Sequence, residues 1–243
     1  MPAAGQERRV AKAGDAAACD LIVALGGDGT TLAAIRTAAA AGKPVLGVAC
    51  GSLGALTAVS AGDLDKALER VAAGDWTARR LPALEVSSDG AEPLVGVNDL
   101  VVVRQAAGQI SASVRVDDEL FIRFAGDGMV VATPGGSGLV FTPLAPHGGC
   151  CPPLVAGPES RLTIELDPAH GGARIELDGQ IRARVDPLEP RTLSVALRPD
   201  HATLVALGGE EPLLTGLRRR RVLMDSPRML ARDDRAALAS RSG

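Results

Sequence analysis

The spacing of apolar residues changes near residue 80, and this change divides the chain into two kinds of structure. Before it, short apolar runs alternate with helical segments, which is typical of a parallel sheet covered by helices. After Leu81, apolar residues recur at every second position, as Ile110, Ala112 and Val114 do, which indicates half-buried strands. The pattern predicts an α/β domain over residues 1–80, an all-β, β-sandwich-like domain over 81–210, and a basic C-terminal segment over 211–243.

The first part begins with a compact apolar run, Leu21–Leu25, which is expected to form a buried strand. An alanine-rich helix is predicted over Thr30–Ala41, because Gly42 follows it and Pro44 lies just beyond. Val45–Val48 is expected to be a second buried strand. A second helix is predicted over Asp63–Ala73, with Asp63 as its N-cap.

The second part contains short strand candidates separated by turn signals such as Asp178-Gly179. Besides the alternating run that starts at Ile110, the candidates are Leu84–Ser87, Leu100–Arg104, Glu119–Phe124, Met129–Thr133, Leu162–Leu166, Ala173–Leu177, Leu193–Leu197 and Thr203–Leu207.

Charge and composition exclude several classes of protein. The net charge is −3 and hydrophobic residues make up 46% of the chain, so a folded protein without a general affinity for nucleic acid is expected. Arg218–Arg221 could bind an anionic partner, but a solvated tail or a strip that docks on the acidic body explains it more simply. No apolar run has membrane-spanning length. The four cysteines lack C-x-x-C spacing, so we expect reduced thiols and a cytoplasmic protein.

The sequence Gly26-Gly27-Asp28-Gly29-Thr30 stands where the first predicted strand leads into a helix. Glycines there let backbone N–H groups approach phosphate oxygens, and a helix N-terminus favours anions. Asp28 would repel such a ligand, unless it accepts or orients the proton of a hydroxyl group during phosphoryl transfer. The alternative is an ordinary strand–helix turn in which Asp28 caps the helix.

Two further segments are weaker candidates for binding residues. Asn98-Asp99 could donate to and accept from a ribose or a base edge, although such pairs are common in turns. Asp127 lies between two glycines, ahead of an apolar strand. The glycine-rich stretch that runs from Thr133 to Gly138 could wrap a ligand with its backbone amides, or it could be a loop without that role.

Taken in order, these segments resemble the successive motifs of the NAD kinase family. The motifs are Gly26–Thr30, Asn98-Asp99, Asp127-Gly128 through Thr133-Pro134 to Ser137, and Asp178-Gly179-Gln180. The resemblance runs from about Asp20 to about Leu207. Diacylglycerol and sphingosine kinases share the first motif, but the Thr-Pro-x-Gly-Ser and Asp-Gly-Gln elements favour NAD kinases. The resemblance implies an α/β nucleotide domain followed by a β-sandwich.

The resemblance also implies an ATP-dependent NAD kinase. Asp28 would act as the base on the 2′-hydroxyl of the adenosine ribose of NAD, and ATP would donate its γ-phosphoryl group to give NADP. Mg²⁺ or another divalent cation would arrive with the nucleotide phosphates, since no carboxylate cluster indicates a metal site. The family forms homo-oligomers, so a dimer or tetramer is expected. The implied nucleotide-binding residues are Gly26, Gly27, Gly29, Thr30, Asn98, Asp99, Asp127, Thr133, Ser137 and Gln180.

The chain departs from the family pattern after Ser137. There the family continues with Thr-Ala-Tyr-Ser, whereas Gly138 here leads directly into Leu139, so the tyrosine of the substrate pocket is missing. The strand and helix that usually precede the glycine loop have no room before Leu21. His147 resembles a histidine of a family Pro-His pair, or is an ordinary turn residue. Two alternatives stay open: a nucleotide-binding protein with weak or no catalysis, and a kinase with another hydroxyl acceptor.

Overall fold

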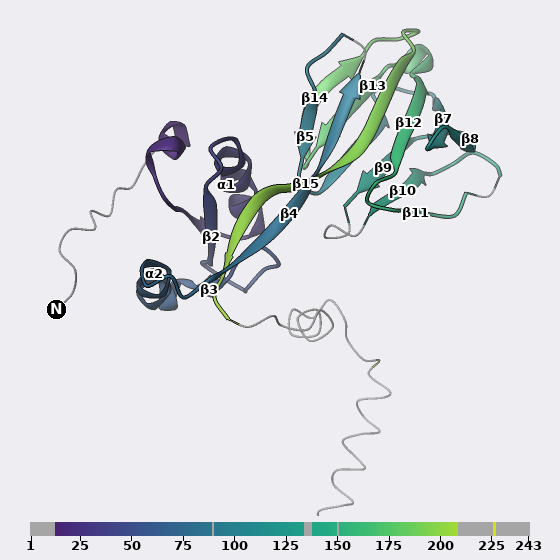
Figure 1. Cartoon of the computed structure of the whole chain (residues 1–243). Helices are drawn as coiled ribbons and strands as arrows, with labels where there is room; N and C mark the ends of the chain where they lie inside the picture. Colours follow the sequence, from purple (N-terminus) through teal and green to yellow (C-terminus); the bar gives the residue numbers. More distant parts are fainter. Residues whose placement is uncertain (1–12, 89, 134–137, 150, 209–225, 227–243) are drawn as a thin grey trace, which may run out of the picture.

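The computed structural model describes residues 13–88, 90–133, 138–149, 151–208 and 226. These residues form an α/β half and a β-sandwich, which two long strands connect (Figure 1). Ser137 and the arginines Arg218–Arg221 lie outside the described residues, as does the predicted C-terminal segment apart from Ser226. Across the described ranges, no helix combines the length and apolar character needed to cross a membrane.

The α/β half contains a small, mainly parallel sheet. Its strands run in the order β1-β2-β15-β4, where β4 spans Thr77–Ser88 and β15 spans Arg191–Ala206. β3 pairs with the end of β2. β2 is parallel to β1, to β3 and to the second half of β15. The elements in chain order are η1 (Ala13–Ala18), β1 (Ile22–Gly26), α1 (Asp28–Ala40), β2 (Pro44–Ala49), β3 (Val59–Ser60), η2 (Ala61–Asp63) and α2 (Leu64–Ala72).

The two helices cover opposite faces of this sheet. α1 presents Leu32, Ile35 and Ala38 at helical spacing, and these side chains pack on Ala24 and Val45. On the other face, the apolar side of α2 around the buried Ala67 packs against β2 and the end of β15. Both faces of β2 are therefore buried, which explains why its sequence is a continuous apolar run.

The sandwich consists of two sheets of antiparallel strands. One has the order β11-β10-β9-β6-β13-β14, and the other continues from β15 through β12 and β7 to β8. A single apolar core fills the space between them, with Phe141 buried at its centre and its ring edge-on to Phe121. Its further elements are β5 (Leu94–Gly96), β6 (Asp99–Arg104), β7 (Ile110–Val116), β8 (Glu119–Gly126), β9 (Gly128–Ala132), β10 (Leu139–Leu144), β11 (Leu154–Ala156), β12 (Arg161–Asp167), η3 (Ala169–Gly171), β13 (Ala173–Leu177) and β14 (Gln180–Val185).

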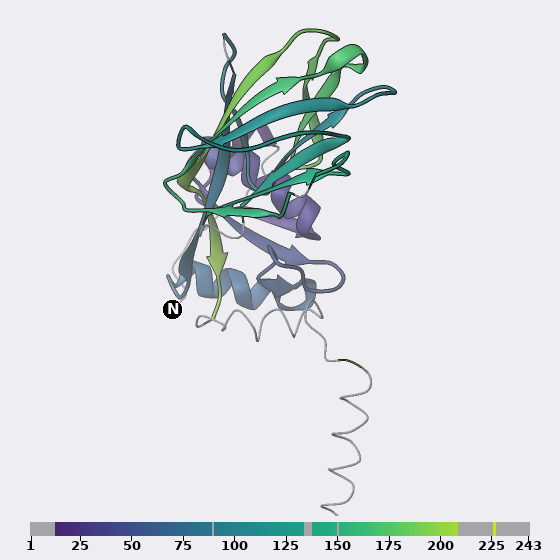
Figure 2. The same cartoon turned by 90° about the vertical axis from the view of Figure 1, so that its right-hand side faces the viewer.

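β4 (Thr77–Ser88) and β15 (Arg191–Ala206) belong to both halves of the molecule. They pair from Thr77 to Ser88 of β4 and from Leu193 to Ala206 of β15, with one register shift between Arg198 and Ala202. Figure 1 and Figure 2 show them running side by side from the sandwich into the α/β half. The first part of β15 lies between β12 and β4, and its second part lies between β2 and β4.

The predicted fold class, an α/β domain with an antiparallel all-β domain, is confirmed. The division of Leu193–Leu197 and Thr203–Leu207 into two strands is wrong. The chain continues as one strand through Pro199 and Asp200, where β15 has an irregularity and Asp200 has φ 49°. β4 is likewise longer than predicted and passes through residue 80 without a break, so the domain boundary there stays a prediction.

The two helix starts also differ from expectation. α1 begins at Asp28, two residues before the predicted Thr30. Asp63 holds the N-cap position of α2, but its side chain makes no capping hydrogen bond. Instead its carboxylate accepts the hydroxyl of Ser60 at 2.6 Å.

Candidate active site

The glycine-rich turn lies at the carboxyl end of β1, where α1 begins. Gly27 is the N-cap of α1 and makes no side-chain cap bond, so the first N–H groups of the helix face the turn without such a partner. A Cβ atom added at Gly27 or Gly29 would meet nothing within 4 Å. These two glycines are therefore not required by packing inside the chain, which leaves room for a ligand against the backbone.

Asp28 binds a second loop and does not cap its own helix. Its Oδ2 accepts the N–H of Ala55 and its Oδ1 accepts the N–H of Leu56, both at 2.9 Å. A Cβ at Gly54 would lie 2.1 Å from Asp28 Oδ1, so only glycine fits there without displacement. The N–H of Gly54 in turn donates to Thr57 Oγ1 at 2.8 Å. The carboxylate is therefore held in one orientation by the backbone of this loop.

The loop around Gly54 was not singled out from the sequence. It follows β2, which is parallel to β1, so both loops emerge at the same edge of the sheet. Gly47 lets it approach closely, because a Cβ there would lie 2.4 Å from the carbonyl oxygen of Leu56. The available signal was the pair Gly51 and Gly54 directly after a buried strand.

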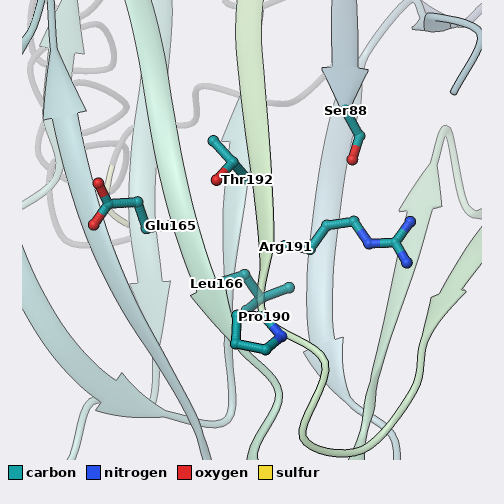
Figure 3. A pocket seen from close by; sticks show the side chains of 6 residues that line it. All are labelled: Ser88, Glu165, Leu166, Pro190, Arg191 and Thr192. Atoms are coloured by element: carbon teal, nitrogen blue, oxygen red, sulfur yellow. The ribbon is translucent and has the colours of Figure 1, made fainter. Parts of the chain in front are cut away.

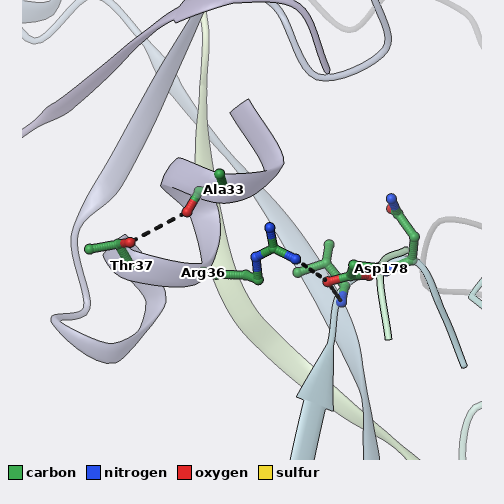
Figure 4. Close-up of polar contacts among 6 residues, drawn as sticks. Ala33, Arg36, Thr37 and Asp178 are labelled. Carbon is green, nitrogen blue, oxygen red and sulfur yellow. Dashed lines mark hydrogen bonds and ion pairs between the residues drawn. The ribbon is translucent and has the colours of Figure 1, made fainter. Parts of the chain in front are cut away.

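Asp178 lies in the turn between β13 and β14, next to Asn98, and its carboxylate links the sandwich to α1. Its side chain is only 1% exposed, and its carboxylate accepts the N–H of Asn98 at 2.7 Å and that of Val97 at 3.0 Å. Arg36 Nη1 on α1 lies 3.7 Å from Asp178 Oδ2 (Figure 4). Thr133 donates its hydroxyl to the carbonyl of Val97 and its N–H to the carbonyl of Asn98, both at 3.0 Å. The structure thus brings Asn98, Thr133 and Asp178 together.

Asp99 lies in an electrostatically unfavourable position next to this group. Burial raises its pKa above the ordinary value, and the negative charges of Asp178 and Glu176 raise it further. Asn98 beside it is exposed, and its side-chain amide makes no hydrogen bond within the described ranges. A polar group of a ligand could therefore bind at both residues.

Asp127 lies at the other end of β6. Its Oδ1 accepts the Nε–H of Arg104 at 2.8 Å, and its carbonyl accepts the N–H of the same residue. β6 spans Asp99–Arg104 and Asp127 lies beside Arg104, so Asp127 is about 20 Å away from Asn98 along the strand, at roughly 3.3 Å per residue. Within one chain, Asp127 and Asn98 can contact only different parts of a ligand.

Gln180 follows the turn that connects β13 and β14. The turn predicted at Asp178-Gly179 is confirmed, with φ values of 52° and 71° at its two residues. Gln180 is exposed on the strand that follows. Its backbone pairs with Leu177, so its position is fixed relative to Asp178.

Two hollows of the described surface lie on the sandwich, and Asp28 lines neither. One, of about 660 Å³, includes His147, whose Nδ1 lies 2.7 Å from Gln109 Oε1. The other, of about 200 Å³, lies around Ser88, Arg191 and Thr192 (Figure 3). Neither contains any of the nucleotide-binding residues predicted from the sequence, so the candidate site is defined by the loops around Asp28 and the group around Asp178.

A glycine-rich turn at a helix N-terminus, beside an oriented carboxylate and at the edge of a parallel sheet, defines the class of α/β nucleotide-binding proteins. Residues 2–76 match the family model of the ATP-NAD kinase N-terminal domain. The chain is 36% identical to the NAD kinase of Heliobacterium modesticaldum over 183 residues. This match covers 66% of this chain and 65% of that protein. It is 35% identical over 210 residues to the NAD kinase of Haloarcula marismortui, which covers 75% and 72%. This chain belongs to the NAD kinase family.

Two solved structures have the same fold. The yeast NADH kinase complexed with NADH aligns with a TM-score of 0.73 and 21% identity, over 86% of this chain and 67% of that one. An NAD kinase from Archaeoglobus fulgidus in complex with ATP aligns with a TM-score of 0.65 and 22% identity, over 86% of both chains. The chain spans 65% and 72% of the length of the two sequence relatives.

The position of Asp99 leads to a prediction about stability. The folded state disfavours the Asp99 carboxylate, so Asp99→Asn should raise the melting temperature at pH 7 by about 2 °C. The difference should shrink as the pH falls through the raised pKa of Asp99 and vanish below about pH 3, where the aspartic acid is neutral in the folded and the unfolded chain. Calorimetry at several pH values measures this. Asp118→Asn, in the exposed β7–β8 turn, serves as the control, and a lower melting temperature of Asp99→Asn at pH 7 would contradict the prediction.

Proposed function

We propose that this protein is an NAD kinase, which transfers the γ-phosphoryl group of ATP to the 2′-hydroxyl of the adenosine ribose of NAD. The observation that carries the proposal is Asp28, which stands in an exposed glycine turn with both oxygens oriented by backbone amides. Membership of the NAD kinase family supports NAD and ATP as substrates. The cysteine spacing supports the cytoplasm as its compartment.

In this proposal Asp28 accepts a proton. The 2′-oxygen of the ribose forms a bond to the γ-phosphorus while the bond from that phosphorus to the bridging oxygen of ADP breaks. The hydroxyl proton passes to Asp28, and ADP leaves with the electron pair of the broken bond. The N–H groups of Ala55 and Leu56 restrict the carboxylate to one orientation, and each of its oxygens keeps lone pairs for the hydroxyl.

The remaining residues would bind the two nucleotides. The glycine turn Gly26–Thr30 would hold phosphate oxygens, while Asn98, Asp99, Thr133 and Gln180 would hold the dinucleotide, together with Ser137. Asp127 would bind its nicotinamide end. No group of three or more potential metal ligands occurs among the residues that the structure describes, so Mg²⁺ or another divalent cation is proposed to arrive with ATP.

The first test is NADP formation from ATP, Mg²⁺ and NAD. Asp28→Asn should lower kcat by about 10²–10⁴-fold, because the amide cannot accept the proton. Asparagine keeps one acceptor for the two backbone N–H groups, so the KM for NAD should change less than kcat. Asp65→Asn, at the exposed first turn of α2, is the matched control and should leave kcat unchanged.

Two outcomes would contradict this proposal. Binding of NAD and ATP in calorimetry without any NADP would indicate a nucleotide-binding protein that does not catalyse the reaction. ATP consumption with another hydroxyl compound, but not with NAD, would indicate a kinase with a different acceptor.

The glycine at position 54 allows an independent test of the orientation of Asp28. Gly54→Ala places a Cβ on the Asp28 carboxylate, so the side chain or the loop must shift. We expect kcat to fall about 10²-fold, because a shift on the scale of 1 Å disturbs the reacting geometry. Gly51→Ala, in the same loop with open space at its Cβ, should behave as wild type. Equal activity of the two variants would rule out this role of Gly54.

We also propose that the protein forms a homo-oligomer through the outer face of the sheet that contains β6 and β9–β11. The residues of this face alternate with buried core residues and include five valines, of which Val155 is 71% exposed. No helix covers this face among the described elements. The valines, called the valine face, are Val101, Val103, Val130, Val140 and Val155.

Sedimentation velocity tests the valine face. The wild type should sediment as a dimer or tetramer, and Val155→Glu should shift it towards the monomer, because a charge would be buried in the interface. Leu188→Glu replaces an apolar residue that is 63% exposed outside the valine face, and it should leave the sedimentation unchanged. A monomeric wild type at micromolar concentration would overturn the proposed assembly.

A further inference from the structure

The buried carboxylate of Asp178 accepts its hydrogen bonds from one short segment. Val97 and Asn98 donate their N–H groups to it, and Thr133 binds the two carbonyls of the same residues. Every backbone polar group of this dipeptide is thus used inside the protein. The Asn98 side chain alone points outwards from an otherwise fixed backbone, which suits a residue that must present its amide to a ligand.

Arg36 connects this fixed segment to the helix of Asp28. It is the only cation that the structure places in an ion pair with Asp178 among the described residues. Asp28 and Arg36 are eight residues apart on α1, which places them about 12 Å apart along one face of the helix at 1.5 Å per residue. The Arg36–Asp178 contact therefore links a fixed point on the helix to a fixed point on the sandwich.

The surroundings of Asp178 favour a contact with a cation. Asp99 lies close enough for the two carboxylates to repel each other, as the raised pKa of Asp99 indicates. The N–H groups of Val97 and Asn98 stabilise the Asp178 carboxylate itself, and the partly exposed Arg36 offsets part of the repulsion from 3.7 Å. Gly96 allows the turn to approach, because a Cβ there would lie 2.8 Å from Leu177 Cδ2 and 3.5 Å from Asp178 Oδ1. The packing and the charge both hold the Asp178 turn against the segment that precedes β6.

We propose that Arg36 and Asp178 are positioning residues, which set the placement of Asn98 and Asp99 relative to Asp28. This inference rests on the proposed function of the site. In this arrangement neither residue touches the reacting atoms. Asp178 fixes the backbone that presents Asn98, and Arg36 holds that unit at a constant place relative to the catalytic end of α1.

The test compares Arg36→Ala, Arg36→Lys and Arg70→Ala. Arg36 is partly exposed and lies within a helix, so alanine should preserve the fold. Arg70→Ala is the matched control, because it removes an arginine of α2 that forms an exposed ion pair with Asp75. Arg36→Ala should lower kcat about tenfold, with the dissociation constant for NAD and the melting temperature close to those of the wild type. Arg36→Lys should restore part of kcat, and Arg70→Ala should change none of these quantities.

A second measurement does not depend on turnover. Hydrogen exchange of the Val97 and Asn98 amides should become about tenfold faster in Arg36→Ala, because Asp178 loses its cation, while the amides of β12 should be unaffected. If the wild type makes no NADP, the proposed function fails, and the exchange rates still decide whether Arg36 holds Asp178 in place. Wild-type turnover in Arg36→Ala, or a loss of kcat explained by a lower melting temperature, would overturn the positioning role.

Discussion

The β4–β15 ladder is the constraint on which the rest of the structure depends. Both strands begin in one half of the molecule and end in the other, and their pairing continues through the register shift near Asp200. The relative placement of α1 and the sandwich is therefore set by a continuous hydrogen-bonded ribbon, not by a flexible linker. This placement brings Asp178 on the sandwich within reach of Arg36 on α1.

Two kinds of rigidity meet at the candidate site. Around Asp28 the loops at the ends of β1 and β2 touch, and glycines at positions 47 and 54 allow contacts that any larger residue would prevent. Around Asn98, by contrast, a buried carboxylate organises the backbone. Close backbone approach and a buried charge are different solutions to the same requirement, namely that polar groups of the site keep their positions before a ligand arrives.

The sequence predicts those parts of the structure that depend on residues close together in the chain. A strand, a glycine turn and a helix can be recognised in Leu21–Ala41, because each depends on neighbouring residues. The prediction that this strand is buried is wrong, because β1 exposes Val23 and Leu25 on one face. The roles of Gly54 and Asp178 depend on partners far along the chain, such as Asp28 and Arg36, and local patterns do not contain them. Asp178-Gly179 was correctly interpreted as a turn. A turn residue is expected at the surface, so this interpretation did not indicate that the Asp178 carboxylate binds the backbone of Val97 and Asn98. The separation of Asp127 from Asn98 likewise follows from strand register.

The long β15 strand also has a consequence for the order in which the protein can fold. During synthesis β1, α1 and β2 leave the ribosome early. However, β2 cannot pair with β15 until Thr203 and Leu204 have been made. Until then one edge of the nascent sheet stays unpaired and exposes its backbone N–H and C=O groups. Completing the sheet is therefore a late, long-range step, which is slow because distant contacts require the closure of a large loop. Such a chain gives chaperones a long period in which to act.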